Sequence, residues 1–333
     1  MSRTTEEILK SAEINPEYKK AAEESPINIT GPDIRGSRAA HLEKLRQFYP
    51  IPGPIPEAVV ETEQQIPTSD GQAIRVRIYT PKQAPLDGSP LIVMYHEGGW
   101  RMGDLTDEDL NCRMFCRDLG AVCINVEYRL APEHPFPTGV NDSWDALKWA
   151  AANAASLKAD PTRGFIVGGA SAGGNIAAVM AHLARDEGLS PPLTGQYLCV
   201  PALLHPEGVP EKHKHEYLSR FNNKDDPVLK NPGQNTVHLT YKPDKSSPLW
   251  EPFNHPLGHK GIAKAYLQVC GIDPLRDEAL IYERVLREEA EVQTKLDFYP
   301  GYGHMFWTNY PKMPMSKKFV EDTLQGFKWL LKH

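Results

Sequence analysis

The sequence predicts an α/β fold in which a mostly parallel sheet is flanked by helices. From about residue 91 onward, short and nearly continuous apolar runs alternate with longer helical patterns, which is typical of strands buried on both faces of a parallel sheet. The stretches 59–66 and 73–80 instead alternate apolar and polar residues, so they predict an antiparallel hairpin with one solvated face. The 333 residues, 40% of them hydrophobic, are enough to bury one large core or two modest ones.

The predicted elements follow one another in a regular order. The strands after the hairpin are LIVMYH (91–96), AVCINVEY (121–128), GFIVGG (164–169), GQYLCVPA (195–202), AYLQVC (265–270) and KLDFYP (295–300). The helices are expected near 107–119, 141–157, 172–187, 276–290 and 316–331. Right-handed crossovers would join these elements into one open, twisted sheet.

Two regions interrupt this alternation. Residues 1–50 have helical patterns without a strand, and 203–255 are rich in Pro, His, Asn and Lys where the next crossover helix should be. Loops of that length in compact domains are usually functional, and open α/β sheets bind ligands at the carboxyl ends of their strands. We therefore expect both regions to form a cap over that edge. The predicted division is an N-terminal cap segment (1–55), a first core part (56–202), a cap insertion (203–255) and a second core part (256–333).

Composition excludes several classes of protein. Lys plus Arg number 37 against 43 Asp plus Glu, a net charge of −6, and no basic block stands out, so nucleic acid is not an expected partner. Residues 1–20 lack the apolar stretch of a secretory signal, and the apolar run 91–95 is too short to span a membrane. We expect a cytoplasmic protein with no membrane span.

Cysteine and histidine patterns do not predict a metal site. The five cysteines are an odd number spread thinly over the chain, which fits buried reduced thiols better than a disulfide framework. Cys112 and Cys116 are four residues apart but lack an adjacent histidine, and His213 and His215 lack acidic co-ligands and are expected to be solvated. No metal is therefore expected.

A serine on a tight turn is the first candidate for chemistry. Gly169-Ala170-Ser171-Ala172-Gly173 comes directly after the run 164–169 and before a helical pattern. This G-x-S-x-G pattern between strand and helix is the setting of a nucleophilic serine, because bulky neighbours would clash on so sharp a turn. The alternative is a small-residue turn that only packs helix against sheet. The placement favours Ser171 as a nucleophile.

A serine nucleophile needs a base and a group that orients the base. Asp273 follows the run 265–270, and His304 follows the run 295–300 on a glycine-flanked loop, in the order that such enzymes use. The alternative for His304 is a solvated loop histidine. Asp277 and Glu278 are rival carboxylates, but they fall in the first turn of a predicted helix, where the helix dipole and capping explain them.

A glycine-containing loop offers oxyanion donors. Glu97, Gly98, Gly99 and Trp100 follow the run 91–95, and the two glycines would let backbone amides turn toward a developing negative charge. The residue after the nucleophile, Ala172, would supply a further amide. A phosphate cradle is the rival interpretation, but no G-K-[ST] follows.

At this point the sequence resembles a known family. Over about residues 57–330, the sequence resembles the hormone-sensitive-lipase-like branch of the α/β-hydrolases. The resemblance rests on five motifs in this order: HEGGW, YRLAPEHPFP (128–137), GASAGGN, DPLRDE and GHMF. The resemblance implies an eight-stranded, mostly parallel sheet, a helical cap and esterase chemistry without a cofactor. By position it implies a nucleophile, a base, its orienting carboxylate and three oxyanion donors, which are Ser171, His304, Asp273, Gly98, Gly99 and Ala172.

Two positions depart from the family pattern. Glu97 replaces the first glycine of the usual H-G-G-G, and Ala170 replaces the aspartate of the usual G-D-S-A-G. The second change should leave the catalytic residues intact. The first places a carboxylate beside the oxyanion loop, so it bears on the substrate and makes Glu97 a candidate substrate-binding residue.

Other residues carry weaker signals. Four aromatic residues are candidates for lining an apolar substrate pocket, although ordinary core or cap packing explains them equally well; they are Trp100, Trp250, Phe306 and Trp307. Glu133 and Asp142 are expected to be buried hydrogen-bond anchors near the active-site loops.

These observations predict a serine hydrolase that cleaves a carboxylic ester of a small or medium-sized hydrophobic molecule through an acyl-enzyme. One alternative is a biosynthetic tailoring enzyme that uses the same residues for deacetylation, lactone opening, or a non-hydrolytic elimination or cyclisation. Another is a small-molecule receptor of the gibberellin-receptor kind, which is expected to lack the catalytic histidine, whereas His304 is present. The expected partner is the ester substrate, and a homodimer is left open.

Overall fold

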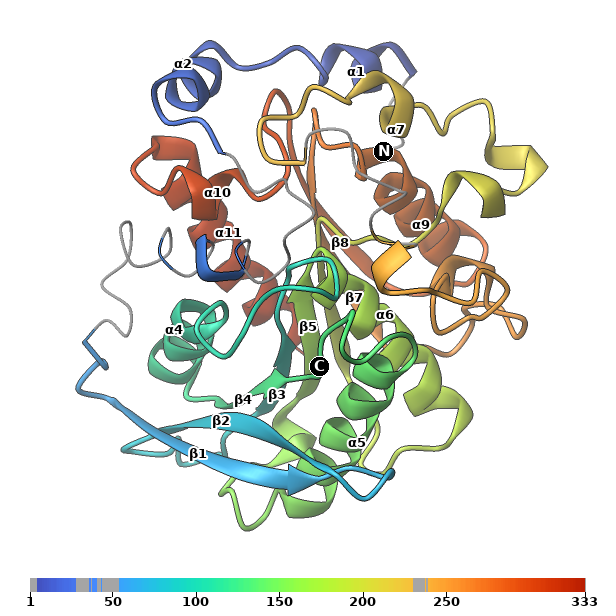
Figure 1. The fold of residues 1–333 in the computed structure, drawn as a ribbon. Coiled ribbons are helices and arrows are strands. Elements are labelled where there is room, and N and C mark those ends of the chain that lie inside the picture. The colour runs from blue at the N-terminus through green and yellow to red at the C-terminus, as the bar shows by residue number, and fades with distance from the viewer. Residues whose placement is uncertain are drawn as a thin grey trace.

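An eight-stranded sheet forms the centre of the molecule (Figure 1). This computed structural model describes residues 5–27, 36, 38–40, 43, 54–229, 237 and 239–332. The strand order is β1-β2-β4-β3-β5-β6-β7-β8. The strands are β1 (Val59–Pro67), β2 (Ala73–Pro81), β3 (Leu91–Tyr95), β4 (Val122–Glu127), β5 (Phe165–Ala170), β6 (Gly195–Cys199), β7 (Lys264–Cys270) and β8 (Thr294–Tyr299).

The strand pairing agrees with the predicted pattern. β1 pairs with β2 and β2 with β4 in antiparallel fashion, and every other neighbouring pair is parallel. The hairpin register runs from Val59 opposite Pro81 to Pro67 opposite Ala73. The expected hairpin and the mostly parallel, eight-stranded sheet are therefore confirmed.

The central strands are apolar on both faces because helices cover both. Along β3, Leu91, Val93 and Tyr95 belong to one buried cluster, while Ile92 and Met94 belong to the other. This alternation places successive side chains in different layers, which explains why the run 91–95 contains no charged residue. The sheet is thus the middle layer of a three-layer molecule.

Helices lie on both sides of the sheet (Figure 1). Those that pack on the larger buried cluster are α5 (Thr138–Asn153), α6 (Ala172–Asp186) and α9 (Arg276–Glu288), and those on the opposite face are α4 (Asp109–Leu119) and α11 (Pro314–Leu330). Shorter helices are α1 (Thr5–Lys10), α2 (Pro16–Glu24), α7 (Ser219–Asn222) and α10 (Phe306–Asn309). In the part of the chain that the structure describes, no helix has both the length and the apolar character needed to cross a membrane.

The N-terminal segment and the 203–229 segment lie near the loops that follow β7 and β8. Gly301, just after β8, donates its N–H to the carbonyl of Ser11 at 2.8 Å and accepts the N–H of Asn15 at 2.9 Å. Figure 1 shows α1, α2 and α7 at the top of the view. Residues 1–4, 28–35, 37, 41–42, 44–53, 230–236 and 238 of the two predicted cap segments lie outside the described residues.

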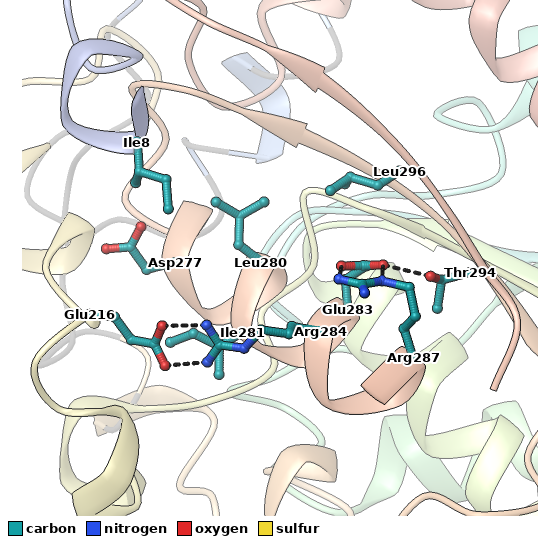
Figure 2. Close-up of a pocket in the computed structure, with 10 residues that line it drawn as sticks. All are labelled: Ile8, Glu216, Asp277, Leu280, Ile281, Glu283, Arg284, Arg287, Thr294 and Leu296. Carbon is teal, nitrogen blue, oxygen red and sulfur yellow. Dashed lines mark hydrogen bonds and ion pairs between the residues drawn. The ribbon is translucent and has the colours of Figure 1, made fainter. Parts of the chain in front are cut away.

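A pocket of about 350 Å³ lies beside the edge strand β8. Figure 2 shows its wall of α9 side chains with Ile8 from α1 and Glu216 from the insertion at its rim. Four of its charged side chains form two ion pairs: Arg284 binds Glu216, and Arg287 binds Glu283 at 2.9 Å. Neither Ser171 nor His304 lines it, so this pocket is separate from the candidate site.

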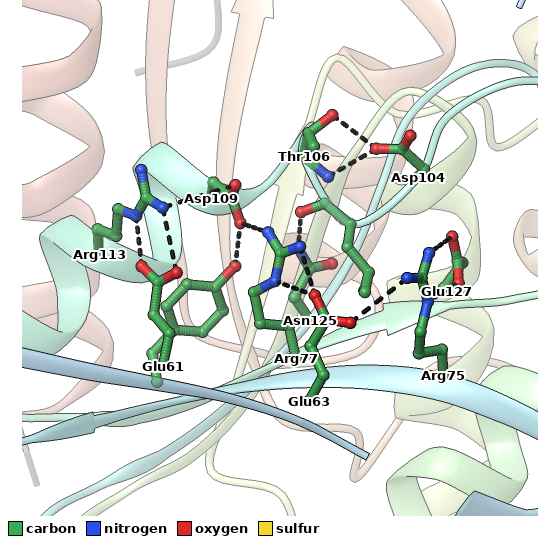
Figure 3. Close-up of polar contacts among 12 residues, drawn as sticks. Glu61, Glu63, Arg75, Arg77, Asp104, Thr106, Asp109, Arg113, Asn125 and Glu127 are labelled. Carbon is green, nitrogen blue, oxygen red and sulfur yellow. Dashed lines mark hydrogen bonds and ion pairs between the residues drawn. The ribbon is translucent and has the colours of Figure 1, made fainter. Parts of the chain in front are cut away.

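An ion-pair network attaches the hairpin to the body of the protein (Figure 3). Arg113 of α4 binds Glu61 of β1 at 2.5 Å, and Arg77 of β2 binds both Glu63 at 2.6 Å and the buried Asp109 at 2.5 Å. Asp109 stands at the start of α4, so strands and helix share one charged contact. The arrangement fixes the orientation of the antiparallel edge without contributing to the candidate site.

One of the two predicted buried anchors is confirmed and the other is wrong. Asp142 is fully buried and accepts hydrogen bonds from the backbone N–H and the guanidinium of Arg129. Glu133 is exposed instead and pairs with Arg38 at 2.9 Å. Its turn lies on the surface, where the carboxylate holds the N-terminal segment against the core.

Candidate active site

Ser171 occupies a strained turn between β5 and α6. Its backbone has φ 54° and ψ −114°, a region that non-glycine residues rarely enter and that costs of order 1–3 kcal/mol. Two hydrogen bonds hold the turn: the Ser171 N–H donates to the carbonyl of Cys199 at 2.9 Å, and the Asn175 N–H donates to that of Ser171 at 3.0 Å. The side chain is half-buried, which leaves its hydroxyl within reach of a small molecule.

The two glycines of the serine motif allow the turn to approach strand β3. A Cβ atom on Gly169 would lie 2.4 Å from the carbonyl oxygen of Tyr95, and one on Gly173 would lie 1.9 Å from the same atom. Real Cβ atoms essentially never come so close, so both positions require glycine. The G-x-S-x-G spacing thus has a direct structural cause in this chain.

The structure brings Ser171, His304 and Asp273 into one hydrogen-bonded chain. His304 Nε2 lies 3.0 Å from Ser171 Oγ, and His304 Nδ1 lies 2.8 Å from Asp273 Oδ2. Asp273 is 1% exposed and His304 4% exposed. The other carboxylate oxygen of Asp273 accepts the Leu275 N–H at 2.7 Å. With a proton on Nδ1, the imidazole presents a free Nε2 lone pair to the serine hydroxyl.

The surroundings of His304 favour its protonated form. Burial alone would lower its pKa, but the nearby carboxylate of Asp273, through its charge and its hydrogen bond, and then Asp226 raise the pKa above the ordinary 6.5. An imidazolium that forms when the serine loses its proton would therefore be stabilised by the carboxylates of Asp273 and Asp226.

Asp226 is a site residue that the sequence did not reveal. It comes from the 203–255 insertion, is 2% exposed, and accepts the backbone N–H of His304 at 2.8 Å. No motif or periodicity marks it, since its segment is irregular and rich in polar residues. Only the folded chain brings it to the histidine loop.

The predicted oxyanion loop has the conformation that its glycines allow. Gly98 and Gly99 have φ 111° and 61°, and the carbonyl of Gly98 accepts the N–H of Met102 at 3.0 Å. Within the described chain, the backbone N–H groups of Gly98, Gly99 and Ala172 have no hydrogen-bond acceptor. Ala172 begins α6, whose first amides lack partners inside the helix. Three amides are therefore free to bind a ligand oxygen.

Glu97 adjoins a rigid histidine. The ring of His96 is fully buried, stacks on Tyr128 with 4.1 Å between centroids, and places Nδ1 2.7 Å from the carbonyl of Glu97. Burial lowers the pKa of His96, so its ring is neutral at pH 7 and adds no charge to the loop. Glu97 is half-buried and precedes the two loop glycines.

The four aromatic candidates make contacts typical of packing. Trp100 stacks on Tyr241 and lies 4.8 Å from Trp250 between ring centroids. Phe306 is fully buried and Trp307 stacks on Phe319 at 3.7 Å, which places both between the histidine loop and α11. A role in substrate binding stays a prediction for all four.

The rival carboxylates of the DPLRDE segment do more than the helix dipole explains. Asp277 is buried and accepts the N–H groups of Leu218 and Ser219 at 2.7 and 2.6 Å. Glu278 is fully buried and binds Arg220 at 2.9 Å. The expectation that both act only as first-turn residues is wrong, because they hold the 203–229 segment to α9.

The histidine and cysteine expectations have different outcomes. All five cysteines are buried free thiols, as predicted. His215 is exposed, but His213 is buried against Phe253 and lies 2.7 Å from Glu216, so its predicted solvation is wrong. The described residues contain no group of three or more His, Cys, Asp or Glu side chains placed to hold a metal ion.

Comparisons with known proteins identify the family of this chain. The α/β hydrolase fold family matches residues 92–308. An AB hydrolase superfamily protein of Schizosaccharomyces pombe is 40% identical over 97% of this chain and 96% of its own length. The versiconal hemiacetal acetate esterase of Dothistroma septosporum is 38% identical over 92% of this chain and 90% of its own.

A solved structure extends the likeness to three dimensions. The crystal structure of vibralactone cyclase superposes with a TM-score of 0.89 and 33% sequence identity, covering 97% of this chain and 96% of that one. Likeness at this level covers the sheet, the helices and the segments outside them. The chain belongs to the α/β-hydrolases, in the hormone-sensitive-lipase-like family whose motifs it carries, and is an enzyme of the carboxylic-ester hydrolase class.

Proposed function

We propose that this enzyme hydrolyses a carboxylic ester of a small or medium-sized hydrophobic molecule, with Ser171 as nucleophile, His304 as base and Asp273 as its orienting carboxylate. The observation that carries the proposal is the continuous chain of hydrogen bonds from Ser171 Oγ through the imidazole to Asp273, at 3.0 and 2.8 Å. This geometry lets a proton leave the hydroxyl as it attacks.

The reaction would proceed in two halves. Ser171 Oγ attacks the ester carbonyl while His304 Nε2 takes its proton, and the imidazolium then protonates the departing alcohol. Water, deprotonated by the same nitrogen, releases the acid from the acyl-enzyme. The amides of Gly98, Gly99 and Ala172 would bind the oxyanion in both halves, since they have no other acceptor among the described residues.

Two further assignments accompany this function. The segments 1–55 and 203–255 would form the cap, a role supported by the contact of Asp226 with the backbone of His304 and by the ties from Gly301 to the N-terminal segment. A cytoplasmic location is supported by five buried, unpaired thiols.

The test is trapping of the nucleophile. With p-nitrophenyl butyrate we expect a burst of phenolate equal to the enzyme concentration, and with a small organophosphate a single adduct, located on Ser171 by peptide mass spectrometry. Ser171→Ala should lose both, with Ser156→Ala, an exposed serine, as the control. An adduct on another serine, or none from a reagent that inhibits the enzyme, would overturn the assignment.

A tailoring reaction is the second candidate, favoured by the likeness to a protein named vibralactone cyclase. In its non-hydrolytic forms, cyclisation or elimination, the reaction would be completed by an internal nucleophile or by elimination instead of by water. Reaction of the pathway substrate in H₂¹⁸O distinguishes these forms from hydrolysis, because only a water-resolved acyl-enzyme yields a product acid that carries ¹⁸O. Finding the gene among biosynthetic genes would also favour this candidate.

A further inference from the structure

A second buried carboxylate lies against the histidine of the candidate site. Asp226 Oδ2 accepts the backbone N–H of His304 at 2.8 Å, and Asp226 Oδ1 accepts the N–H groups of Val228 and Leu229 at 2.8 and 2.7 Å. Asp226 is 2% exposed, so the contact is shielded from water. The same carboxylate thus fixes its own turn and the histidine loop.

The segment around Asp226 also holds the loop that carries Asp273. The side-chain amide of Asn223 donates to the carbonyl of Asp273 at 3.1 Å, and the hydroxyl of Ser219 donates to that of Pro274 at 2.9 Å. Residues 219–226 therefore contact the backbone of both loops that meet at the imidazole.

The histidine loop is shaped to admit the carboxylate. A Cβ atom on Gly303 would lie 1.9 Å from Asp226 Oδ2, with the hydroxyl of Tyr18 as the next side chain at 2.9 Å. The φ of Gly303 lies outside the left-handed region, so its backbone does not itself demand glycine. Space for Asp226 is the physical reason for the glycine before His304.

We propose that Asp226 is a positioning residue for His304, supplied by the 203–255 insertion. This inference rests on the proposed role of His304 as the base. One carboxylate, Asp273, orients the ring through Nδ1, and the other, Asp226, orients the main chain of the same residue. The insertion thereby contributes to the alignment of the base as well as covering the site.

Charge gives Asp226 a second effect on the base. Burial, and then repulsion by Asp273, raise the pKa of Asp226 to about 7, while the charge of His304 opposes the rise. Five titratable groups of the described chain interact electrostatically with Asp226. They are Asp273 and Cys270 from the end of β7, His304 after β8, Tyr18 from α2 and Tyr310 after α10. Arg220, the cation that opposes protonation of His304, is already paired with Glu278.

The experiment replaces the charge and keeps the shape. In Asp226→Asn the amide oxygen can replace Oδ1 or Oδ2 but not both, so the amide nitrogen faces either the N–H of His304 or the N–H groups of Val228 and Leu229. The side chain also cannot become an anion when the imidazole takes a proton. We expect kcat per titrated serine to fall about tenfold, with KM for p-nitrophenyl butyrate within about twofold. The acid-side midpoint of kcat/KM against pH should move to lower pH, because an anion that raises the pKa of His304 is lost.

Two further variants complete the design. Asp225→Asn changes the exposed neighbour and should match the parent in kcat and midpoint. Gly303→Ala keeps the carboxylate but pushes it from the His304 N–H, so kcat should again fall about tenfold. This variant tests the contact even if Asp226→Asn does not fold, as judged by circular dichroism.

The outcomes separate the two proposals. If Asp226→Asn folds and keeps the parent kcat and midpoint, or if Gly303→Ala is as active as the parent, Asp226 does not position the base. A loss of kcat with an unmoved midpoint would assign Asp226 a purely structural role and also overturn the inference. If Ser171→Ala retains the esterase activity, the proposed function itself fails, whatever Asp226 does.

Discussion

His304 is constrained at three separate atoms. Its Nδ1, Nε2 and backbone N lie within 3.0 Å of Asp273, Ser171 and Asp226 respectively. Each partner comes from a different part of the chain, so the imidazole has one orientation that satisfies all of them. These three contacts fix the ring nitrogen that faces the serine hydroxyl, as the proposed role of His304 as base requires.

Asp273→Asn should preserve the fold and lower kcat by roughly 10³ to 10⁴, as the corresponding change does in serine proteases, because an amide that donates to Nδ1 would stabilise the wrong tautomer. The measurement is kcat on p-nitrophenyl butyrate, with the unfolding curve recorded alongside. Asp225→Asn is the matched control. A full-strength Asp273→Asn enzyme would show that another carboxylate serves the histidine.

Activity should depend on pH through His304. The base works when neutral, so kcat/KM should fall as the pH drops through the pKa of His304, which Asp273 and Asp226 raise above 6.5 despite its burial. The check is a pH profile of kcat/KM on a neutral ester whose stability is measured over the same range. A midpoint below 6.5 would contradict the electrostatic account.

Glu97 should tune the substrate range without carrying the chemistry. Glu97→Gly restores the family pattern in the loop, and we expect kcat/KM on neutral esters to stay within about tenfold of the parent, or about 1.4 kcal/mol of barrier. Gly98→Ala is the contrasting variant, since its Cβ would lie 2.3 Å from the carbonyl of Met102. A loss of several hundredfold in Glu97→Gly would make Glu97 a catalytic or substrate-binding group and strengthen the tailoring alternative.

At the scale of elements, helix α9 serves as the attachment point of the insertion. Its first turn presents Asp277 to the backbone of 218–219 and Glu278 to Arg220 and to the N–H of Leu203. Burial raises the pKa of Glu278 to about 7, partly offset by Arg220. A buried charge of this kind is costly when its partner is removed, so the insertion is firmly joined to the core at this end.

Asp277→Asn should weaken that junction. Both backbone N–H groups bind the single oxygen Oδ2, which an amide oxygen can replace, but the charge and the ion pair with Arg276 at 2.7 Å are lost. We therefore expect about 2 kcal/mol less unfolding free energy. Urea unfolding measures the change, and kcat should fall by less than for Asp273→Asn. Asp244→Asn, on an exposed turn, is the control. Unchanged stability would mean that the junction does not depend on this charge.

At the scale of the whole molecule, one buried aromatic side chain packs the N-terminal segment against the core, in addition to its backbone contacts with Gly301. Tyr18 of α2 is fully buried among Tyr302, Phe306 and Tyr310, with ring centroids 5.7, 6.1 and 5.5 Å away. These partners flank the loop and short helix that follow His304. The same side chain therefore both attaches the N-terminal segment to the core and supports the loop that carries His304.

Tyr18→Ala should remove that link. Truncation of a fully buried aromatic residue costs about 3 kcal/mol or more of unfolding free energy, and we expect kcat to fall as well because the ring supports the loop of His304. Thermal and urea unfolding measure the first effect. Leu9→Ala, at a site 46% exposed, should change neither. Equal stability of the two variants would show that the segment packs independently of the core.

The sequence by itself determined the sheet and the order of the candidate catalytic residues. A strand that is buried on both faces of a sheet is a short apolar run bounded by turns, so it can be recognised from the local sequence alone. For this reason the six runs from 91–96 to 295–300 correspond to β3–β8. The turn around Ser171 could also be predicted from the sequence, because the glycines that it requires, Gly169 and Gly173, lie within two residues of the serine. Asp273 and His304 were identified from their places just after strands.

Only the tertiary structure decided how the irregular segments are used. Asp226, Asp277 and His213 are buried by contacts with residues many tens of positions away in the sequence. The sequence of a polar loop without periodicity does not show which of its charged side chains will be buried. Burial of a charge depends on the partners that folding brings to it. The sequence therefore located the strand ends that carry the proposed catalytic residues, while the packing of the insertion decided what holds the proposed base in place.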